Sequence, residues 1–238
     1  MKVFVVIPTY NERDNIRPLC EQILALGGEW QIVVVDDNSP NGTAAEVQAL
    51  AEETGRVHLL ARPGKLGFAS AIKAGFRYAL GREPDYVVEM DADFSHDPQY
   101  LPQMLARAEG AEVVIGSRYI PGGGTRRWGL LRRWLSRGAN QFARWMLGLQ
   151  VHDCTAGFRC YRSEALRQLD WEAIAVEGYS FLIEMTYRCQ QKGYRLAEVP
   201  IVFVDRQRGK SKISRRIIVE AFFLVLRLAW ERLWRRFA

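Results

Sequence analysis

Two aspartates one residue apart, Asp91 and Asp93, follow the apolar run at residues 86–90. The run predicts a buried strand that ends at these acids. Alternate residues of an extended segment point the same way, so both carboxylates can reach one point just past the strand end. A hard divalent cation suits that point, because Mg²⁺ binds one or two carboxylates while phosphates and waters complete its octahedron. The pair therefore indicates a metal-assisted diphosphate site, although Asp is also common in loops after strands without such a function.

A second pair of acids, Asp36 and Asp37, follows the run at residues 31–35 and begins a turn rich in Pro, Asn and Gly. In other nucleotide sites, the acid after the second strand accepts hydrogen bonds from ribose hydroxyls. The alternative is that both carboxylates only solvate the turn. The residues of this stretch alone leave the two interpretations equal.

Arginine and aromatic residues are concentrated at residues 126–144, which hold six arginines and no acid. A helix over this segment would have Leu131, Trp134 and Leu135 on one face and Arg132, Arg133 and Ser136 largely on the other. One interpretation is a core helix with a solvated basic side. The other is a membrane segment that lies in the interface, where Trp and Arg are both common.

The net charge of +6 is concentrated near the carboxyl end. Residues 1–205 hold 23 Lys and Arg against 25 Asp and Glu, a net charge of −2, whereas residues 206–238 hold 10 against 2, a net charge of +8. The stretch 205–212 combines cations with Gly and is suited to folding over an anion. From Ile213 onward the periodicity predicts a helix with a broad apolar surface. We expect it to lie in the interface of an anionic membrane, with Arg232, Arg235 and Arg236 near the head groups; packing on the protein body or on a partner helix is the alternative.

Other features argue against several classes of protein. The four cysteines lack CxxC and zinc-ligand spacing, which favours reduced thiols in a cytoplasmic protein over a disulfide framework. No stretch has 18 uncharged apolar residues, so a membrane-spanning helix is not expected. The glycines around Lys65 do not match a P-loop. A nucleic-acid-binding module is disfavoured because the basic residues of the tail alternate with apolar ones and the rest of the chain is net acidic.

Short apolar runs alternate with segments of helical periodicity, which predicts a parallel sheet with helices on its faces. Strands are expected at residues 3–7, 31–35, 57–60, 86–90, 112–115 and 195–204. Helices are expected from about residue 11, from residue 43, and at residues 68–80 and 179–192. Ligands of such sheets bind outside the carboxyl ends of the strands, and each of the first four strands is followed by polar residues. These strand ends therefore predict one shared site.

Six motifs follow one another along residues 3–213. They are Pro8-Thr9-Tyr10-Asn11-Glu12, residues 35–43, Asp91-Ala92-Asp93-Phe94-Ser95-His96, Gly116-Ser117-Arg118-Tyr119, Gly157-Phe158-Arg159, and the stretch from Glu198-Val199-Pro200-Ile201 through Ser211-Lys212. Together they resemble the dolichyl-phosphate mannose synthases, which are inverting family-2 glycosyltransferases. The resemblance implies an α/β fold of the Rossmann-like GT-A type, with a mainly parallel central sheet. It also implies a catalytic domain at residues 1–212, with a basic interfacial helix region at residues 126–147, and an amphipathic membrane-associating helix at residues 213–238.

The resemblance further implies transfer of mannose from GDP-mannose to dolichyl phosphate or another polyprenyl phosphate, giving a β-linked lipid phosphosugar and GDP. A close alternative is the same reaction with UDP-glucose or another nucleotide sugar. Some family members have membrane-spanning segments after the catalytic domain; this chain is expected to lack them and to lie, as a peripheral protein, on the cytoplasmic face of a membrane. A small membrane-anchoring protein is a further candidate partner, and nucleic acid is not. A non-catalytic scaffold is disfavoured by the intact acids and their matching arginines.

By position in the family, three groups of residues form the site. The nucleotide is expected on Pro8, Tyr10, Glu12, Val35, Asp36, Asp37, Lys65, Asp91 and Ala92. Mg²⁺ or Mn²⁺ is expected on Asp91, Asp93 and Ser95, where the family can have Gln in place of the shorter Ser95. The acceptor phosphate is expected on Arg118, Arg132, Ser136, Arg206 and Lys212. Asp91, Asp93, Arg118 and Arg206 are the expected catalytic residues.

The expected chemistry is positioning and electrostatic stabilisation. An acceptor phosphate is already ionised near neutral pH, so no general base is needed, and guanidinium groups can bind its oxygens in pairs. The metal stabilises the departing GDP as a Lewis acid. No catalytic role is assigned to a histidine, and His96 is interpreted as a supporting residue. Asp153 and Glu184 are candidates for contact with the sugar.

Overall fold

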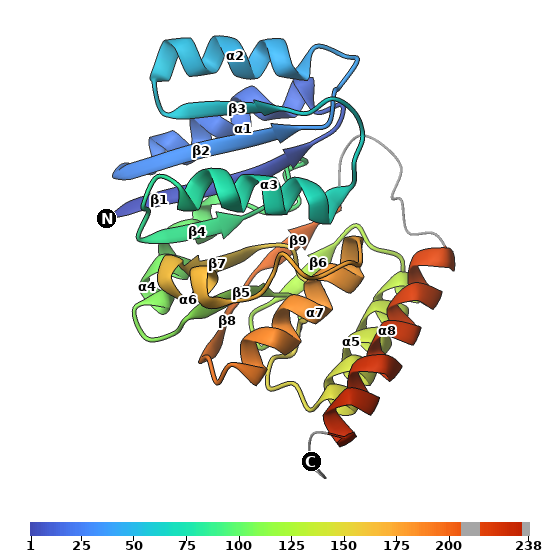
Figure 1. Cartoon of the computed structure of the whole chain (residues 1–238). Coiled ribbons are helices and arrows are strands. Elements are labelled where there is room, and N and C mark those ends of the chain that lie inside the picture. Colours follow the sequence, from blue (N-terminus) through green and yellow to red (C-terminus); the bar gives the residue numbers. More distant parts are fainter. Residues whose placement is uncertain (206–214, 235–238) are drawn as a thin grey trace.

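The computed structural model describes residues 1–205 and 215–234 (Figure 1). In this part of the chain, one sheet has the strand order β3-β2-β1-β4-β7-β5-β8, and β6 pairs with β9 in a second sheet. The strands are β1 (Lys2–Thr9), β2 (Glu29–Asp36), β3 (Val57–Ala61), β4 (Tyr86–Glu89), β5 (Val113–Ser117), β6 (Gly124–Arg126), β7 (Arg159–Arg162), β8 (Leu196–Pro200) and β9 (Val202–Val204). The helices are α1 (Arg13–Ala25), α2 (Thr43–Thr54), α3 (Phe68–Leu80), α4 (Leu101–Ala108), α5 (Leu130–Leu147), α6 (Ser163–Gln168), α7 (Gly178–Gln191) and α8 (Arg215–Trp234), with a short 3₁₀ helix, η1 (Pro98–Tyr100).

The large sheet is mainly parallel, as the sequence predicted. Strands β1 to β4 run parallel to one another, and so do β5 and β8, whereas β7 runs antiparallel to both β4 and β5. The expected α/β fold with a mainly parallel sheet is confirmed. β7 was not predicted, because its four residues are bounded by turn signals and carry two arginines.

Helices cover both faces of the sheet, and the alternation of side chains along β1 divides the core in two (Figure 1). Val3, Val5 and Ile7 belong to the core with α1, α2 and α4. Phe4 and Val6 belong to the core with α3, α5, α6, α7 and α8. Helix α3 approaches β1 closely at Gly75, where an added Cβ would overlap Val6. Because α3 follows β3, its amino end lies at the carboxyl ends of the parallel strands.

The prediction of one continuous strand at residues 195–204 is wrong. The segment divides into β8, in the large sheet, and β9, which pairs with β6. The last ladder bond between β8 and β5 runs from the Ile201 N–H to Ser117 O. Ile201 O then accepts from the N–H of Gly124 in β6, the first contact of the second sheet. The chain thereby changes sheets beside the end of β5, where the site arginine Arg118 follows.

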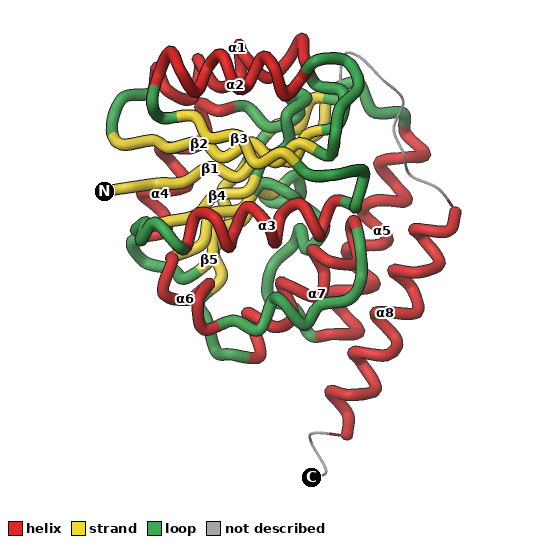
Figure 2. Tube along the Cα trace, turned by 45° about the horizontal axis from the view of Figure 1, so that its top comes forward, coloured by secondary structure: helices red, strands yellow, loops and turns green. Residues whose placement is uncertain are grey.

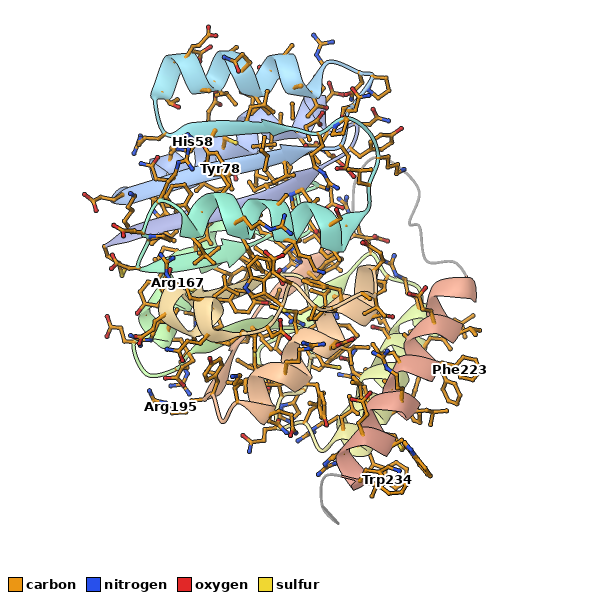
Figure 3. The ribbon with its side chains drawn as sticks, viewed as in Figure 1. His58, Tyr78, Arg167, Arg195, Phe223 and Trp234 are labelled. Atoms are coloured by element: carbon orange, nitrogen blue, oxygen red, sulfur yellow. The ribbon has the colours of Figure 1, made fainter. Side chains whose placement is uncertain are left out.

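Helix α8 lies beside α5 and α7, away from β1 to β3 (Figure 2). Leu224, Val225, Leu228 and Ala229 are buried in the same core as α5 and α7. The opposite side is exposed, and Phe223 and Trp234 project from it into solvent (Figure 3). One face of the helix therefore packs on the protein body, which was the alternative to a membrane location. Arg235 and Arg236 lie outside the described residues. No helix within residues 1–205 and 215–234 has both the length and the apolarity to cross a bilayer.

Candidate active site

A cavity of about 360 Å³ opens at the carboxyl ends of β1, β4 and β5. Its amino-terminal wall includes the predicted site residues Pro8, Tyr10, Glu12, Asp37, Lys65, Asp91, Ala92 and Asp93. Its carboxyl-terminal wall includes Arg118, Arg132, Thr155, Ala156, Gly157, Tyr179 and Asp205. The structure therefore brings the predicted metal acids and two of the predicted acceptor arginines to one cavity.

The remaining predicted site residues lie elsewhere. Val35 is fully buried in β2, and Asp36 is buried at its end, so neither side chain lines the cavity. Ser95 is buried beneath the turn that carries the two acids. Ser136 lies behind the cavity, where its Oγ accepts a hydrogen bond from the Tyr119 hydroxyl at 2.6 Å. Arg206 and Lys212 lie outside the described residues.

The two acids stand on a tight turn after β4. The strand continues through the Met90 N–H, which donates to Val6 O, and the Asp91 N–H then donates to His96 Nδ1 at 3.0 Å. Asp93 Oδ1 accepts from the Ser95 N–H at 3.1 Å. These bonds fold the turn back on itself, so that Asp91 and Asp93 both face the cavity.

The donors on this turn fit a hard divalent cation. Within the described residues, no cluster of three or more His, Cys, Asp or Glu side chains forms a metal centre, so the protein offers only two carboxylates here. Ser95 Oγ is buried and has no hydrogen-bond partner, which leaves a third oxygen beside Asp93. Few carboxylates with remaining ligands from phosphate and water are the set that Mg²⁺ prefers.

His96 is a supporting residue and not a base. Its ring is buried, stacks on Phe158 with centroids 5.0 Å apart, and meets Phe203 edge-on. Burial lowers the pKa of His96 to about 4, against the opposing effect of Asp93. The neutral ring uses Nδ1 as an acceptor for the Asp91 N–H, which assigns the proton to Nε2.

The amino-terminal wall ends in a loop between β3 and α3. Lys65 lies over the Tyr10 ring, with Nζ 3.9 Å from its centroid. Asp37 Oδ2 accepts from the N–H groups of Leu66 and Gly67, at 3.1 and 3.3 Å, and its Oδ1 pairs with Arg62 at 2.9 Å. Asp37 therefore fixes the loop that carries Lys65.

Asp36 holds the neighbouring turn together. Its carboxylate accepts from Thr9 Oγ1 and from the N–H and hydroxyl of Ser39, at 3.0, 2.9 and 2.5 Å. These bonds support the interpretation of a turn-forming acid, and its nucleotide-binding role stays a prediction.

Arg118 is the best-anchored cation of the cavity. Its Nε and one terminal nitrogen donate to the two carboxylate oxygens of Asp153, both at 2.7 Å, and the same terminal nitrogen donates to Thr155 Oγ1 at 2.8 Å. Burial alone would raise the pKa of Asp153, but the adjacent guanidinium holds it below the usual value. Asp153 thus orients Arg118. The Asp153 side chain is fully buried and does not line the cavity, so it does not make the contact with the sugar for which it was a candidate.

Arg132 is anchored more loosely. It pairs with Asp205 at 2.7 Å and lies over the Trp128 ring, 4.0 Å from its centroid. Its side chain is 26% exposed, against 5% for Arg118. Of the two arginines that line the cavity within the described residues, one is therefore rigid and solvent can reach the other.

Glu184, the other candidate for contact with the sugar, faces away from the cavity. It is buried on α7 and pairs with Arg188 at 2.6 Å and with Arg227 of α8 at 3.3 Å. Its role is to attach α8, which the sequence could not indicate because Arg227 is 43 residues away.

Sequence reasoning also missed a buried charged group beneath the cavity. Glu89, on β4, lies 3.6 Å from Arg159 on β7 and accepts from the Tyr161 hydroxyl. Burial raises the pKa of Glu89 to about 8, although Arg159 opposes the shift. The available signals were a Glu inside an apolar strand and an Arg at the end of the Gly157-Phe158-Arg159 motif.

Residues 4–170 match the family described as Glycosyl transferase family 2. A polyprenol monophosphomannose synthase of Mycolicibacterium smegmatis is 43% identical over 226 residues, covering 94% of this chain and 85% of that protein. An undecaprenyl-phosphate mannosyltransferase of Micrococcus luteus is 42% identical over 234 residues, covering 98% of this chain and 96% of that protein.

Among solved structures, the glucosyl-3-phosphoglycerate synthase of Mycobacterium tuberculosis has a similar fold. Its complex with Mn²⁺, UDP and glucosyl-3-phosphoglycerate has a TM-score of 0.66 and 19% identity, covering 97% of this chain and 79% of that one. Its complex with Mg²⁺ and UDP has a TM-score of 0.67 and 18% identity, covering 96% and 79%. At this level of identity the likeness concerns the fold.

Proposed function

The chain belongs to glycosyl transferase family 2, and from that premise we propose that it transfers mannose from GDP-mannose to a polyprenyl phosphate, with inversion at the sugar and with help from Mg²⁺ or Mn²⁺. The two mannosyl-transferring relatives, similar over nearly the whole chain, support the sugar and the acceptor. The observation that carries the proposal is the single cavity lined by Asp91 and Asp93 on one side and by Arg118 and Arg132 on the other. The likeness to a fold that binds Mn²⁺ or Mg²⁺ with UDP supports a metal at the acids.

Asp91 and Asp93 are the residues that would hold the ion, and Ser95 stays a predicted third ligand whose buried side chain does not line the cavity. When bound, the ion would offset the negative charge that develops on the departing GDP. Asp93 Oδ1 accepts from the Ser95 N–H, and the Asp91 backbone N–H is held by His96 Nδ1, so the backbone of the turn is fixed before a metal binds. This rigidity is what a preorganised electrostatic site requires.

Arg118 and Arg132 bind the acceptor phosphate in this proposal. The phosphate brings its own negative charge and attacks the sugar without losing a proton, so its approach to the diphosphate is the main difficulty. Asp153 fixes Arg118 at a defined angle, while Arg132 can follow the phosphate because its pairing with Asp205 is partly exposed to solvent. Ser136 accepts a hydrogen bond from the Tyr119 hydroxyl, and its contact with the acceptor phosphate stays a prediction. Arg206 and Lys212 remain predictions from the resemblance.

Tyr10, Glu12, Asp37 and Lys65 form the nucleotide side. The stack of Lys65 on Tyr10 places a cation beside an aromatic face at the cavity rim. Asp37 fixes the Lys65 loop, and Asp36 and Val35 support the same strand end from behind. Preference for guanine over uracil is part of the proposal and is the first property to test.

The exposed apolar faces of α5 and α8 support a peripheral location on a membrane surface, and the cytoplasmic face stays a prediction. They carry Leu130, Leu131, Trp134, Leu135, Trp145, Phe222, Phe223, Trp230, Leu233 and Trp234. The two helices touch through the stacked rings of Phe142 and Phe222. An exposed apolar surface of this kind marks an interaction site, and Trp and Arg together suit a lipid interface. A small membrane-anchoring partner could cover part of the same surface.

A transfer assay tests the reaction. Purified protein is given GDP-mannose or UDP-glucose with a short polyprenyl phosphate and Mn²⁺, and transfer is corrected for donor hydrolysis. We expect mannosyl transfer that stops when the metal is chelated. Faster transfer of glucose than of mannose would show that UDP-glucose, and not GDP-mannose, is the donor. Transfer at an unchanged rate after chelation would refute the proposed role of the metal.

Flotation with liposomes tests the membrane surface. Trp134→Ser combined with Trp230→Ser should reduce binding to vesicles that contain anionic lipid, whereas Arg195→Ser, which alters an exposed residue far from α8 (Figure 3), should not. Equal binding by these two variants and the unaltered protein would show that another surface is used. Activity of the pure protein on lipid-embedded acceptor tests whether a partner protein is needed.

A further inference from the structure

The side chains of Phe158 and Arg159 lie beneath the cavity, fully buried, and neither lines its wall. Gly157, just before them, does line it, close to Asp91 Oδ1 and to Leu182. The segment therefore runs under the floor between the two walls of the site. The two buried side chains contact different walls: Phe158 contacts His96 of the amino-terminal wall, and Arg159 contacts the backbone of the carboxyl-terminal wall.

Phe158 supports the turn that carries the metal acids. Its ring stacks on His96 at an interplanar angle of 18° with centroids 5.0 Å apart. His96 has to present its Nδ1 lone pair to the Asp91 N–H, so the plane of the imidazole decides the position of the Asp91 backbone. Phe203 touches the ring only edge-on, so Phe158 is the contact that sets this plane.

Arg159 supports the opposite wall. Its Nε donates to Ala156 O and one terminal nitrogen donates to Cys154 O, both at 2.8 Å. These two carbonyls belong to the loop whose side chains Asp153 and Thr155 hold Arg118. On β4, the carboxyl group of Glu89 lies 3.6 Å from the guanidinium.

We propose that Phe158 and Arg159 are two separate positioning residues: Phe158 fixes the metal-binding turn through His96, and Arg159 fixes Arg118 through the backbone of residues 153–157. Because they are consecutive in the chain, they hold the two reacting partners at a set separation. This inference rests on the proposed function. Displacements of about 1 Å between reacting groups can cost about a hundredfold in rate. The positions that Phe158 and Arg159 set should therefore affect the rate of transfer directly.

The test uses the full-length protein with Phe158→Leu and Arg159→Lys. Calorimetry measures Mn²⁺ affinity in the presence of GDP and, separately, the affinity for a short polyprenyl phosphate; kcat and KM follow from transfer assays. Phe158→Leu should weaken Mn²⁺ binding about tenfold and leave acceptor binding within about twofold. Arg159→Lys keeps the charge but loses the paired N–H groups, so it should weaken acceptor binding and raise the acceptor KM about tenfold, with Mn²⁺ binding unchanged.

The chain offers a matched control for each variant. Phe76→Leu makes the same change in a buried ring that contacts Tyr161 and Trp171 instead of His96. Arg162→Lys alters another β7 arginine that also donates to two carbonyls, those of Ala108 and Glu109, away from the cavity. Both controls should lower the melting temperature while leaving the two affinities as in the unaltered protein.

Several outcomes would overturn the inference. If both variants change the same affinity, or behave like their controls, Phe158 and Arg159 have only a general structural role. If Arg159→Lys does not fold, Thr155→Val is the substitute, because it removes the hydroxyl that accepts a hydrogen bond from Arg118 in the loop that Arg159 supports. Unchanged acceptor binding in Thr155→Val would also refute the inference. Failure of the unaltered protein to transfer mannose or to bind Mn²⁺ with GDP would instead refute the proposed function.

Discussion

The amino-terminal and carboxyl-terminal walls of the cavity are built by different means. The amino-terminal wall stands at the ends of parallel strands whose side chains pack as an apolar core, and its turns are held mainly by bonds between residues close to those ends. The carboxyl-terminal wall depends mainly on buried ions, with Arg118 held by Asp153 and Arg159 beside Glu89, whereas in the amino-terminal wall the buried pair of Asp37 and Arg62 only adds to the turn bonds. The difference shows that local chain geometry can place carboxylates for a metal, whereas a buried arginine needs a partner from a distant segment.

The largest effect on transfer is expected from Asp93→Ala in the amino-terminal wall. Removing one of the two acids should lower transfer by at least about a hundredfold, since Lewis-acid stabilisation is worth several kcal/mol. Transfer assays and Mn²⁺ titration in the presence of GDP measure it. A smaller loss of thermal stability is also expected, because Asp93 is buried and its Oδ1 accepts from the Ser95 N–H. Retained activity with weakened folding would mean that the acid has a structural role.

Asp153→Asn in the carboxyl-terminal wall should act on stability and activity together. Arg118 would keep its buried charge without a counter-ion, which costs about 3–5 kcal/mol when a buried pair is broken. Urea unfolding measures this loss, and acceptor affinity should fall as well. The matched control is Asp205→Asn, whose partner Arg132 is partly exposed, with an expected loss below about 1 kcal/mol. Equal losses in the two variants would contradict the contrast between a rigid and an adaptable arginine.

Gly75→Ala examines the apolar packing behind the amino-terminal wall. An added methyl group would overlap Val6 and force α3 away from β1, with an expected cost of about 1–3 kcal/mol. Chemical denaturation gives the magnitude. Gly110→Ala provides a comparison, since no atom lies within 4 Å of the position that its added methyl group would take. A stable Gly75→Ala protein would show that the contact between α3 and β1 is not tight.

The smallest effect is expected at the attachment of α8. Glu184→Gln removes the buried charge that pairs with Arg188 and Arg227, and we expect a loss of about 1–2 kcal/mol because both arginines are partly solvated. Glu231→Gln, an exposed partner of the same Arg227, should cost less than about 0.5 kcal/mol. Hydrogen exchange along α8 would report the loosening. No change in exchange would indicate that the apolar face alone holds the helix.

Much of the amino-terminal half could be predicted from the sequence. Strands β1 to β4 coincide with four apolar runs, and the polar residues after them do meet in one cavity, because parallel strands present their carboxyl ends to the same edge. The carboxyl-terminal half was harder. The strand expected at residues 195–204 divides at Pro200, and β7 has no periodic signal of its own because it is only four residues long and owes its place to the strands β4 and β5 on either side.

The sequence by itself determined the α/β class, the edge of the sheet that carries the site, and the acids Asp91 and Asp93, because these follow from periodicity and from residue types at strand ends; the resemblance to a family added the arginines. Only the tertiary structure decided that Asp153 serves Arg118 and that Glu184 serves α8. Those pairs join residues 35 and 43 positions apart in the sequence. They form because a buried charge is costly unless an opposite charge lies beside it, and only the fold determines which opposite charge is near enough.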